Sequence, residues 1–424
     1  MKPNNQNIPP EDGGKRRRPF KRLLALALFA VLFGCAAVFV AVEVRPSIGA
    51  AVAVRMRAIF GPRVVAQLET IVFRAQDTFK QWRYASGAEQ AEAPWEQAAA
   101  ATPIPATRTP APPDATETPA PTEQTGELPV QTATSTPAAT HVVWTPSDLI
   151  PFGDLPGEGA WQPYLYGPDG EAVAMRTFLQ PDPERPYAIV AVVAFDLART
   201  DLGFVLGFND PGLPDGPRGD GRIPEADRRA EVLLAAFNGG FRTANGGFGA
   251  MADGLVAVPP VDGMATVGIY RDGSVRIGAW GAEIVDSPEL AAWRQNCPLV
   301  IEGGEISPRV YNDSITDWGG TISNEIVARR SGLGLDEAGG TLYYFAGPSL
   351  NMPALADAML AAGVHDGMLL DINHFWVHFT AIRAGEAGEL FADPLLPGEM
   401  IDQVDRYLAA SPVDFFYVTL RERN

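Results

Sequence analysis

A long segment with too few large apolar side chains to fold divides this chain in two. Residues 85–145 consist largely of Ala, Pro and Thr, as in TPIPATRTPAPPDATETPAPTEQTGELP. Such a composition buries too little apolar surface to offset the entropy of ordering the backbone, and its prolines favour an extended chain. We therefore predict a disordered linker over residues 85–145 and a folded domain over residues 146–424.

The N-terminal part contains a candidate membrane span. Leu23–Val42 is a run of twenty residues without a charge, and a helix of this length crosses the roughly 30 Å hydrocarbon layer of a bilayer. Residues 1–22 carry the larger cluster of Lys and Arg, which favours a cytoplasmic tail. The pattern predicts a single-pass membrane protein whose C-terminal domain is extracytoplasmic.

Two other interpretations of this run stay open. One is a cleaved signal peptide, and the other is a lipoprotein signal in which LFGC, Leu32–Cys35, resembles a lipobox. A signal peptide has a shorter apolar core that ends at small residues, whereas here the apolar run continues past Cys35.

Residues 43–84 show helix-like periodicity. Apolar residues such as Leu68, Ile71, Val72 and Phe79 recur mostly at three- and four-residue spacings among several arginines. The segment is predicted to be a juxtamembrane helix that lies along an anionic membrane surface or forms a solvated spacer.

Charge differs sharply between the two parts. Residues 1–85 hold 14 basic and 5 acidic side chains, a net charge of +9, which leaves −27 for the remainder. An exterior this acidic argues against sequence-independent binding of nucleic acid. Because only Cys35 and Cys297 occur, the domain has no internal disulfide.

The domain alternates short apolar runs with Gly-rich turns, which is typical of strands. Two helices are also predicted, PELAAWRQN after Ser287 and NMPALADAMLAAG from Asn351 to a stop at Gly363. This mixture predicts an α+β fold with a mixed or mostly antiparallel sheet and packed helices. The predicted strands are residues 188–195, 204–208, 232–237, 266–270, 299–304, 341–347 and 367–371.

Three motifs carry candidate site residues. Asn238 ends an apolar run and precedes Gly239 and Gly240, which permit close backbone approach to a ligand or a simple hairpin turn. Arg330 precedes Ser-Gly-Leu-Gly, and its guanidinium suits a phosphate or an ordinary ion pair.

The third motif is GMLLDINHFWVHF. Asp371 follows an apolar run of strand length and is suited to nucleophilic or acid–base work, or to a simple turn. Asn373 and His374 follow closely in the sequence, and we predict that they form hydrogen bonds near Asp371. A metal site of His365, Asp371, His374 and His378 is an alternative, although we predict no metal and no cofactor.

Together these motifs resemble the phosphodiester glycosidase domain family over about residues 230–377. The resemblance lies in FNGGF at 237–241, RSGLG at 330–334, the LYYF strand, the PALADAMLAAGV helix and LLD at 369–371. After the aspartate the family has Gly-Gly-Gly-Ser, where this chain has Ile372, Asn373, His374 and Phe375.

The resemblance implies hydrolysis of a sugar 1-phosphodiester. By this resemblance the family's site residues carry over to Asn238, Arg330 and Asp371. We predict that Asp371, Arg330 and His374 are catalytic, with His374 replacing contacts of the family's Gly-Gly-Gly-Ser loop, and that Asn238, Gly239, Gly240 and Asn373 bind the substrate. The predicted partner is a glycosyl phosphodiester or cell-surface glycan. The alternative is an inactive module of the same fold that binds glycans or phosphopolymers, which the bulky residues after Asp371 favour.

Overall fold

The computed structural model describes residues 62–95, 144–312, 317–318 and 326–421. The predicted tail 1–22, the predicted span 23–42 and most of the predicted linker lie outside the described residues. Within the described ranges, no helix is long and apolar enough to cross a membrane. The structure therefore does not uphold the prediction of a single-pass membrane protein with an extracytoplasmic domain, because no described helix could span a membrane.

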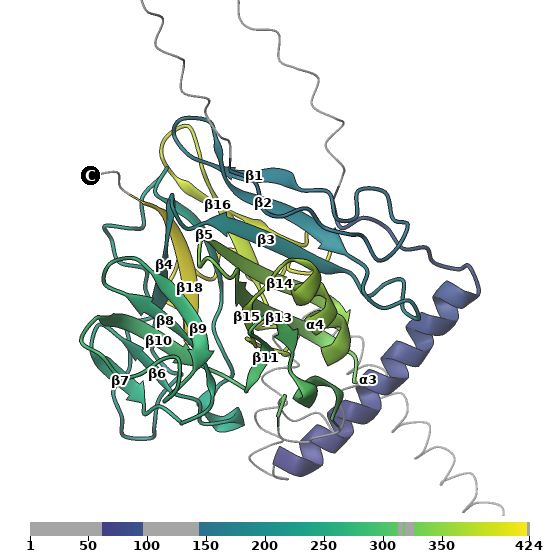
Figure 1. The fold of residues 1–424 in the computed structure, drawn as a ribbon, viewed down its shortest axis with the longest axis horizontal. Coiled ribbons are helices and arrows are strands. Elements are labelled where there is room, and N and C mark those ends of the chain that lie inside the picture. The colour runs from purple at the N-terminus through teal and green to yellow at the C-terminus, as the bar shows by residue number, and fades with distance from the viewer. Residues whose placement is uncertain (1–61, 96–143, 313–316, 319–325, 422–424) are drawn as a thin grey trace, which may run out of the picture.

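Antiparallel sheets make up most of the described structure. The strands form three sheets, and every pairing between their strands is antiparallel (Figure 1). The described part of the chain contains only two α-helices, α3 (Pro62–Ala85) and α4 (Met352–Ala361). The predicted α+β fold with packed helices is therefore wrong, although the mostly antiparallel pairing is observed.

The first sheet has eight strands. Its middle strands β3, β14 and β13 are buried along nearly their whole length, because both faces of the sheet are covered. Their apolar, β-branched and aromatic residues suit such a position. In spatial order the strands are β1 (Gln162–Tyr166), β2 (Ala172–Leu179), β3 (Val190–Asp196), β14 (Thr341–Leu350), β13 (Ala328–Leu335), β15 (Asp366–Leu369), β11 (Leu299–Glu302) and β12 (Glu305–Ile306).

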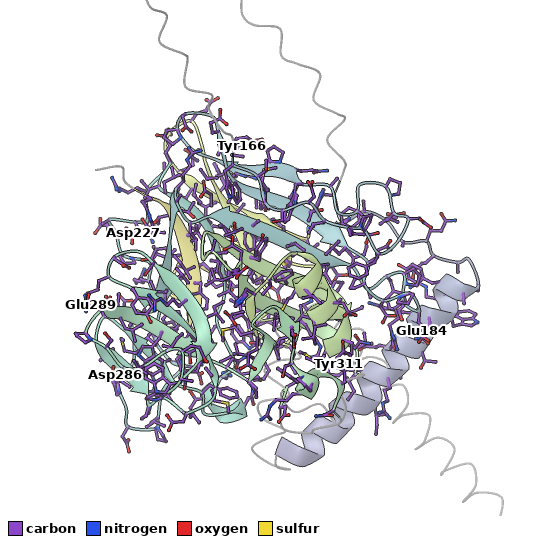
Figure 2. The ribbon with its side chains drawn as sticks, viewed as in Figure 1. Tyr166, Glu184, Asp227, Asp286, Glu289 and Tyr311 are labelled. Atoms are coloured by element: carbon purple, nitrogen blue, oxygen red, sulfur yellow. The ribbon has the colours of Figure 1, made fainter. Side chains whose placement is uncertain are left out.

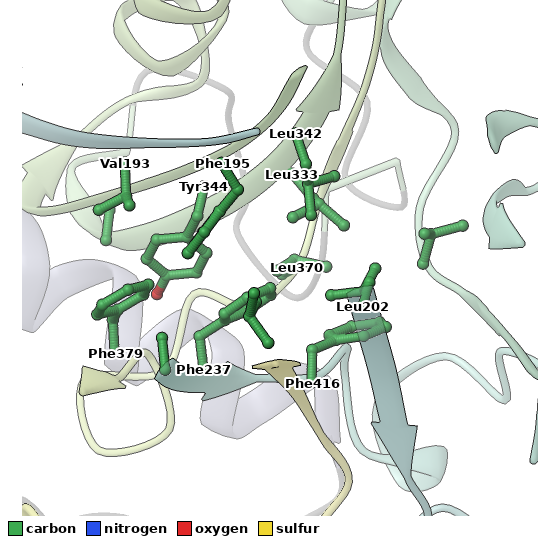
Figure 3. Close-up of a cluster of buried hydrophobic side chains, with 14 of the residues drawn as sticks. Val193, Phe195, Leu202, Phe237, Leu333, Leu342, Tyr344, Leu370, Phe379 and Phe416 are labelled. Carbon is green, nitrogen blue, oxygen red and sulfur yellow. The ribbon is translucent and has the colours of Figure 1, made fainter. Parts of the chain in front are cut away.

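The second sheet packs against one face of the first through aromatic rings. Figure 3 shows Phe195 and Tyr344 of the first sheet facing Phe237, Phe379 and Phe416 of the second. The ring centroids of Phe237 and Tyr344 lie 4.8 Å apart. This contact places the end of β5 against the first sheet. The strands are β17 (Leu390–Pro394), β16 (Phe379–Ala384), β5 (Leu233–Asn238), β18 (Phe415–Leu420) and β4 (Thr200–Val205).

The third sheet contains a segment that we predicted to be a helix. PELAAWRQN forms strand β10, which pairs with β6 on one side and β8 on the other. A helix this short is only marginally stable by itself. As a strand, the segment forms backbone hydrogen bonds with two neighbouring strands, and the prediction of a helix was therefore wrong. The strands are β7 (Leu255–Val258), β6 (Ala250–Ala252), β10 (Leu290–Gln295), β8 (Ala265–Tyr270) and β9 (Val275–Ala279).

Helix α4 (Met352–Ala361) confirms the second predicted helix. The Oδ1 atom of Asn351 accepts a hydrogen bond of 2.8 Å from the N–H of Ala354, and Gly363 has a φ of 81° beyond the end of the helix. Its apolar residues pack against the face of the first sheet that carries Tyr343 and Phe345. The described residues also include two short 3₁₀ helices, η1 (Thr243–Asn245) and η2 (Pro308–Tyr311).

Helix α3 (Pro62–Ala85) lies against the domain through polar contacts. The carboxylate of Asp77 accepts hydrogen bonds from Arg185 at 3.1 Å and from the hydroxyl of Tyr187 at 2.5 Å, and Lys80 donates to Ser349 at 3.1 Å. Further along, Trp95 is buried against Phe178. The described part of the predicted juxtamembrane and linker segments therefore contacts the domain, while the proposed domain boundaries remain predictions.

Replacing Asp77 by alanine should loosen this attachment. The Arg185 and Asp77 side chains are each only 13% exposed, so the change leaves a guanidinium and a phenol short of an acceptor. We expect a loss of about 1–3 kcal/mol in the free energy of unfolding, measured by urea denaturation, and faster proteolysis within residues 62–95. Glu184→Ala, at the exposed residue labelled in Figure 2, is the matched control and should change neither. An Asp77→Ala protein as stable as the wild type would contradict the contact.

Candidate functional site

Three segments remote in sequence meet at one small hollow that is partly open to solvent. Asn238 is the last residue of β5, Asp414 directly precedes β18, and Asp371 follows β15. β5 and β18 are paired neighbours in the second sheet, whereas β15 belongs to the first. The hollow thus lies where the ends of strands from two sheets meet. It is lined by Asn238, Gly239, Gly240, Arg242, Asp371, Trp376, Val413 and Asp414.

The side-chain amide of Asn238 joins the two sheets. Its Oδ1 accepts hydrogen bonds from the Tyr344 hydroxyl at 2.9 Å and from the N–H of His378 at 3.2 Å. Its Nδ2 donates to the Ser331 hydroxyl at 3.0 Å. An amide held by this many partners is fixed in position, and it forms one rigid wall of the hollow.

Asp371 is a buried carboxyl group held in one orientation. Its Oδ1 accepts from the N–H groups of Ile372 at 2.6 Å and Asn373 at 2.9 Å. Burial raises the pKa of Asp371 to about 7; those two N–H groups oppose the shift and the charge of Asp414 adds to it. Near neutral pH this carboxyl group exists in both protonation states, which suits an acid–base residue.

Asp414 forms a buried ion pair with Arg294. The Nε atom of Arg294 lies 2.7 Å from Asp414 Oδ2, and the two side chains are 0% and 2% exposed. Arg294 also donates to the carbonyl oxygens of Phe241 at 2.6 Å and Gln295 at 2.7 Å. Burial raises the pKa of Asp414, and the neighbouring guanidinium opposes this shift. The carboxylate of Asp414 therefore lines the hollow with its charge balanced by the guanidinium of Arg294.

The two glycines after Asn238 allow Asp414 to approach the backbone. The N–H of Gly240 donates to Asp414 Oδ2 at 3.3 Å, and a Cβ atom at Gly239 would lie 2.1 Å from the same oxygen. The turn thus requires glycine at 239 because of the carboxylate, which explains the Asn-Gly-Gly motif physically.

Gly239→Ala should therefore displace Asp414 from Arg294. We expect a destabilisation of about 1–3 kcal/mol from overpacking, measured by chemical denaturation. Gly398→Ala is the matched control, because a Cβ there meets no atom within 4 Å. Equal stability of the two variants would mean that the close approach at Gly239 is not required.

Arg242 supplies a cation at the wall of the hollow. Its side chain is 25% exposed, and its Nε lies 3.7 Å from Asp210 Oδ2. This Nε is buried and makes no hydrogen bond within the described ranges. A guanidinium with an unused donor beside a hollow is suited to an anionic ligand.

The structure places Arg330 elsewhere. Arg330 is fully buried, and it donates to the carbonyl oxygens of Leu350 at 2.8 Å and Ile326 at 3.0 Å. Burial lowers its pKa to about 10. The next residue, Ser331, bonds Asn238, and successive side chains of a strand point to opposite faces. Arg330 is therefore directed away from the hollow and does not meet Asn238 and Asp371 there.

The residues after Asp371 form a loop whose side chains line two different hollows. Asn373 Oδ1 accepts from the N–H groups of Phe375 at 2.9 Å and Trp376 at 3.4 Å, so its side chain holds the loop in shape. Trp376 lines the hollow of Asp371, whereas His374 lines a second hollow on the other side of the loop.

Sequence reasoning missed Arg242, Asp414 and Arg294. Arg242 directly follows the Asn-Gly-Gly-Phe motif and Asp414 directly precedes a strand, so both positions offered a local signal. Arg294 offered none, because its segment was interpreted as a helix.

The described residues hold no group of three or more His, Cys, Asp and Glu side chains placed to bind a metal ion. Of the four residues of the alternative metal site, His365 pairs with Asp366 at 2.8 Å. Asp371 lines one hollow, and His374 and His378 line the other.

Comparisons with known proteins assign no family. No protein-family model and no curated protein matches the sequence. Among solved structures, the protein is weakly similar to the catalytic domain of zebrafish N-acetylglucosamine-1-phosphodiester alpha-N-acetylglucosaminidase, described as auto-inhibited by its pro-peptide. The identity is 14%, the match covers 62% of this chain and 88% of that one, and the TM-score is 0.37.

Two further structures are similar at a comparable level. A hypothetical protein from Synechocystis has 10% identity, coverage of 58% of this chain and 62% of that one, and a TM-score of 0.35. A putative exported protein from Burkholderia pseudomallei has 10% identity, coverage of 55% and 74%, and a TM-score of 0.31. Similarities at this level do not assign a function.

Proposed function

We propose that the hollow at Asp371 hydrolyses a glycosyl phosphodiester at the bond between sugar C1 and the phosphate oxygen. The observation that supports this proposal is the meeting of two buried carboxyl groups, Asp371 and Asp414, with a guanidinium, Arg242, at one solvent-connected hollow. Glycoside hydrolysis needs two carboxyl groups beside the anomeric carbon, and a phosphodiester adds a need for positive charge.

In the proposed reaction, protonated Asp371 gives its proton to the departing phosphate oxygen while the C1–O bond breaks. The ionised carboxylate of Asp414, kept charged by Arg294, stabilises the positive charge that develops at the anomeric centre. Water then adds to C1 and loses its proton to Asp371, which restores the starting state. Because the surroundings of the two carboxyl groups differ, one can act as the proton donor while the other acts as the ionised, stabilising group.

In this proposal Arg242 binds the phosphate, the role that the family resemblance implied for Arg330. Because Arg242 lines the hollow and has an unused donor, Arg242→Gln should weaken binding of the phosphodiester. We expect KM to rise about tenfold or more, consistent with the loss of one charge-assisted hydrogen bond, with a smaller change in kcat. Steady-state kinetics checks this, and an unchanged KM would exclude Arg242 from phosphate binding. Arg218→Gln, at another partly exposed arginine that bonds backbone carbonyls including Leu213 O, is the control.

The test of the proposal is turnover of an N-acetylglucosamine 1-phosphodiester. The wild type and Asp286→Asn, a change at an exposed carboxyl group, should release the sugar, and the rate should fall as the pH rises above about 7 because the proton on Asp371 is lost. Asp371→Asn should reduce kcat at least about 100-fold. Turnover that persists in folded Asp371→Asn would refute the catalytic role.

A second candidate function is glycan or phosphopolymer binding without catalysis. The observation that favours it is that Asp371 is only 6% exposed, with Trp376 in the same wall. Wild-type protein that binds a phosphorylated glycan without hydrolysing any glycosyl phosphodiester would support this candidate over the enzyme.

A further inference from the structure

Helix α3 turns its polar side towards the domain and its apolar side outward. Asp77 and Lys80 form hydrogen bonds with residues of the domain. On the opposite side of the helix, Ile71, Phe79 and Trp82 are 64%, 56% and 62% exposed. A surface helix normally packs its apolar side against the core of its own protein. Because α3 does the reverse at the periphery of the described structure (Figure 1), its apolar side is open to a partner.

The outward side of α3 repeats with a heptad spacing. Alternating steps of four and three residues separate Val64, Leu68, Ile71, Ala75, Thr78 and Trp82, all of which lie within the helix. A repeat of 3.5 residues over nearly three heptads is the pattern of a coiled coil, in which a second helix with the same repeat covers the seam. The spacing therefore indicates that the partner is another helix.

The exposed part of this seam, which we call the outer stripe, is ready to be covered. It consists of Ile71, Ala75, Thr78, Phe79 and Trp82, all of which are exposed. The hydroxyl of Thr78 donates to a backbone carbonyl of its own helix at 2.8 Å, so burial would leave this group satisfied. The rings of Phe79 and Trp82 are stacked on each other, with centroids 5.9 Å apart.

The area of the outer stripe suits a pair of identical helices. At roughly 150–250 Å² for a whole aromatic side chain, the exposed parts of Phe79 and Trp82 supply roughly 200–300 Å² per copy. In a pair, these two rings alone would therefore contribute at least about a third of the 1,200 Å² or so that small specific interfaces bury. The remaining residues of the seam would add to this area along a helix of 24 residues.

Charge favours a second copy over a membrane surface. The outer stripe has no charged residue, so two identical stripes meet without repulsion. The part of the chain beyond residue 85 carries a net charge of −27, and an anionic bilayer would repel so acidic a domain beside the helix. In a helix pair the two domains lie on opposite sides, about 20 Å or more apart, which exceeds the Debye length of about 8 Å at physiological salt.

We propose that α3 is a dimerisation helix, which pairs through its outer stripe with α3 of a second copy of this chain. The polar side of each helix stays bound to its own domain through Asp77 and Lys80. The dimer therefore carries its two domains on the outside of a helix pair. This inference is independent of the proposed function, because no residue of the outer stripe lines the hollow at Asp371.

The mass of the full chain in solution, from size-exclusion chromatography with light scattering, tests the pairing. We expect the wild type to have the mass of two chains, and Ile71→Glu and Trp82→Glu that of one, because a charge in the seam would be buried without a partner. Ile401→Glu is the matched control and should stay dimeric, since Ile401 and Ile71 are both 64% exposed. Dimers that survive both stripe variants would overturn the proposal.

A monomeric wild type would overturn the proposal as well. If that monomer also bound phosphatidylglycerol vesicles more tightly than Ile71→Glu does, the outer stripe would be a membrane-binding surface instead.

Cross-linking identifies the face that pairs. Ala75 lies near the middle of α3, so parallel and antiparallel pairs of full length both bring its two copies together. In a Cys35→Ser background, where the remaining Cys297 is buried, mild oxidation of Ala75→Cys should give disulfide-linked dimers. Gln76→Cys, at the half-buried neighbouring position, should give few. Equal linkage of the two variants, or none at Ala75→Cys, would overturn the pairing through the outer stripe.

Discussion

Asp371→Asn is expected to yield a protein that is more stable than the wild type at pH 8. In the folded chain burial keeps the proton on Asp371 up to about pH 7, whereas an unfolded aspartate loses it near pH 3.8. The folded state therefore binds more protons between these values, and the free energy of unfolding falls as the pH rises through this window. Asparagine carries no such penalty, and the gain at pH 8 is up to about 4 kcal/mol.

The measurement is urea denaturation of both proteins between pH 4 and pH 8. The difference in stability should be smallest at pH 4, should grow as the pH rises towards 7 and should level off above it. Asp286→Asn serves as the control and should follow the wild type, since its side chain is exposed. A stability difference that does not vary with pH would show that Asp371 is not a buried titrating group.

Arg294→Met is expected to be the most destabilising single change at the site. It removes the partner of a buried carboxylate, Asp414, and the donors to the carbonyl oxygens of Phe241 and Gln295. Removing one member of a buried ion pair costs about 3–5 kcal/mol, because the other charge stays buried without compensation. The free energy of unfolding from urea titration measures the loss.

The double variant Arg294→Met with Asp414→Asn identifies the cause. If the uncompensated charge dominates, neutralising Asp414 should recover about 1 kcal/mol or more of the loss. Additive effects of the two substitutions would contradict a coupled pair. Arg271→Met is the control, since Arg271 donates to the backbone of Pro288 in an exposed contact.

The sequence predicted those features of the site that depend on local chemistry. Asn238 ends a strand and Asp371 follows one, as an apolar run bounded by polar and glycine residues indicates. The helix that begins after Asn351 was predictable because its cap is encoded in neighbouring residues. Each of these signals lies within a few positions of the residue concerned.

The rest depends on contacts between remote segments. Arg330 and Ser331 are adjacent, and which of them faces the hollow depends on how β13 pairs with β14 and β15. The segment around Arg294 has helical spacing but becomes a central strand because β6 and β8 pair with it. The role of Asp414 arises only where β18 meets β5.

The position of the cleaved bond tests the central claim most directly. Hydrolysis of an N-acetylglucosamine 1-phosphodiester in ¹⁸O-labelled water, followed by mass spectrometry of the released phosphate ester, shows which bond water has attacked. Our account predicts that the wild-type protein releases a phosphate ester without label, because water adds to sugar C1, and that Asp371→Asn releases almost none. Label in the phosphate, or equal release by the two proteins, would contradict it.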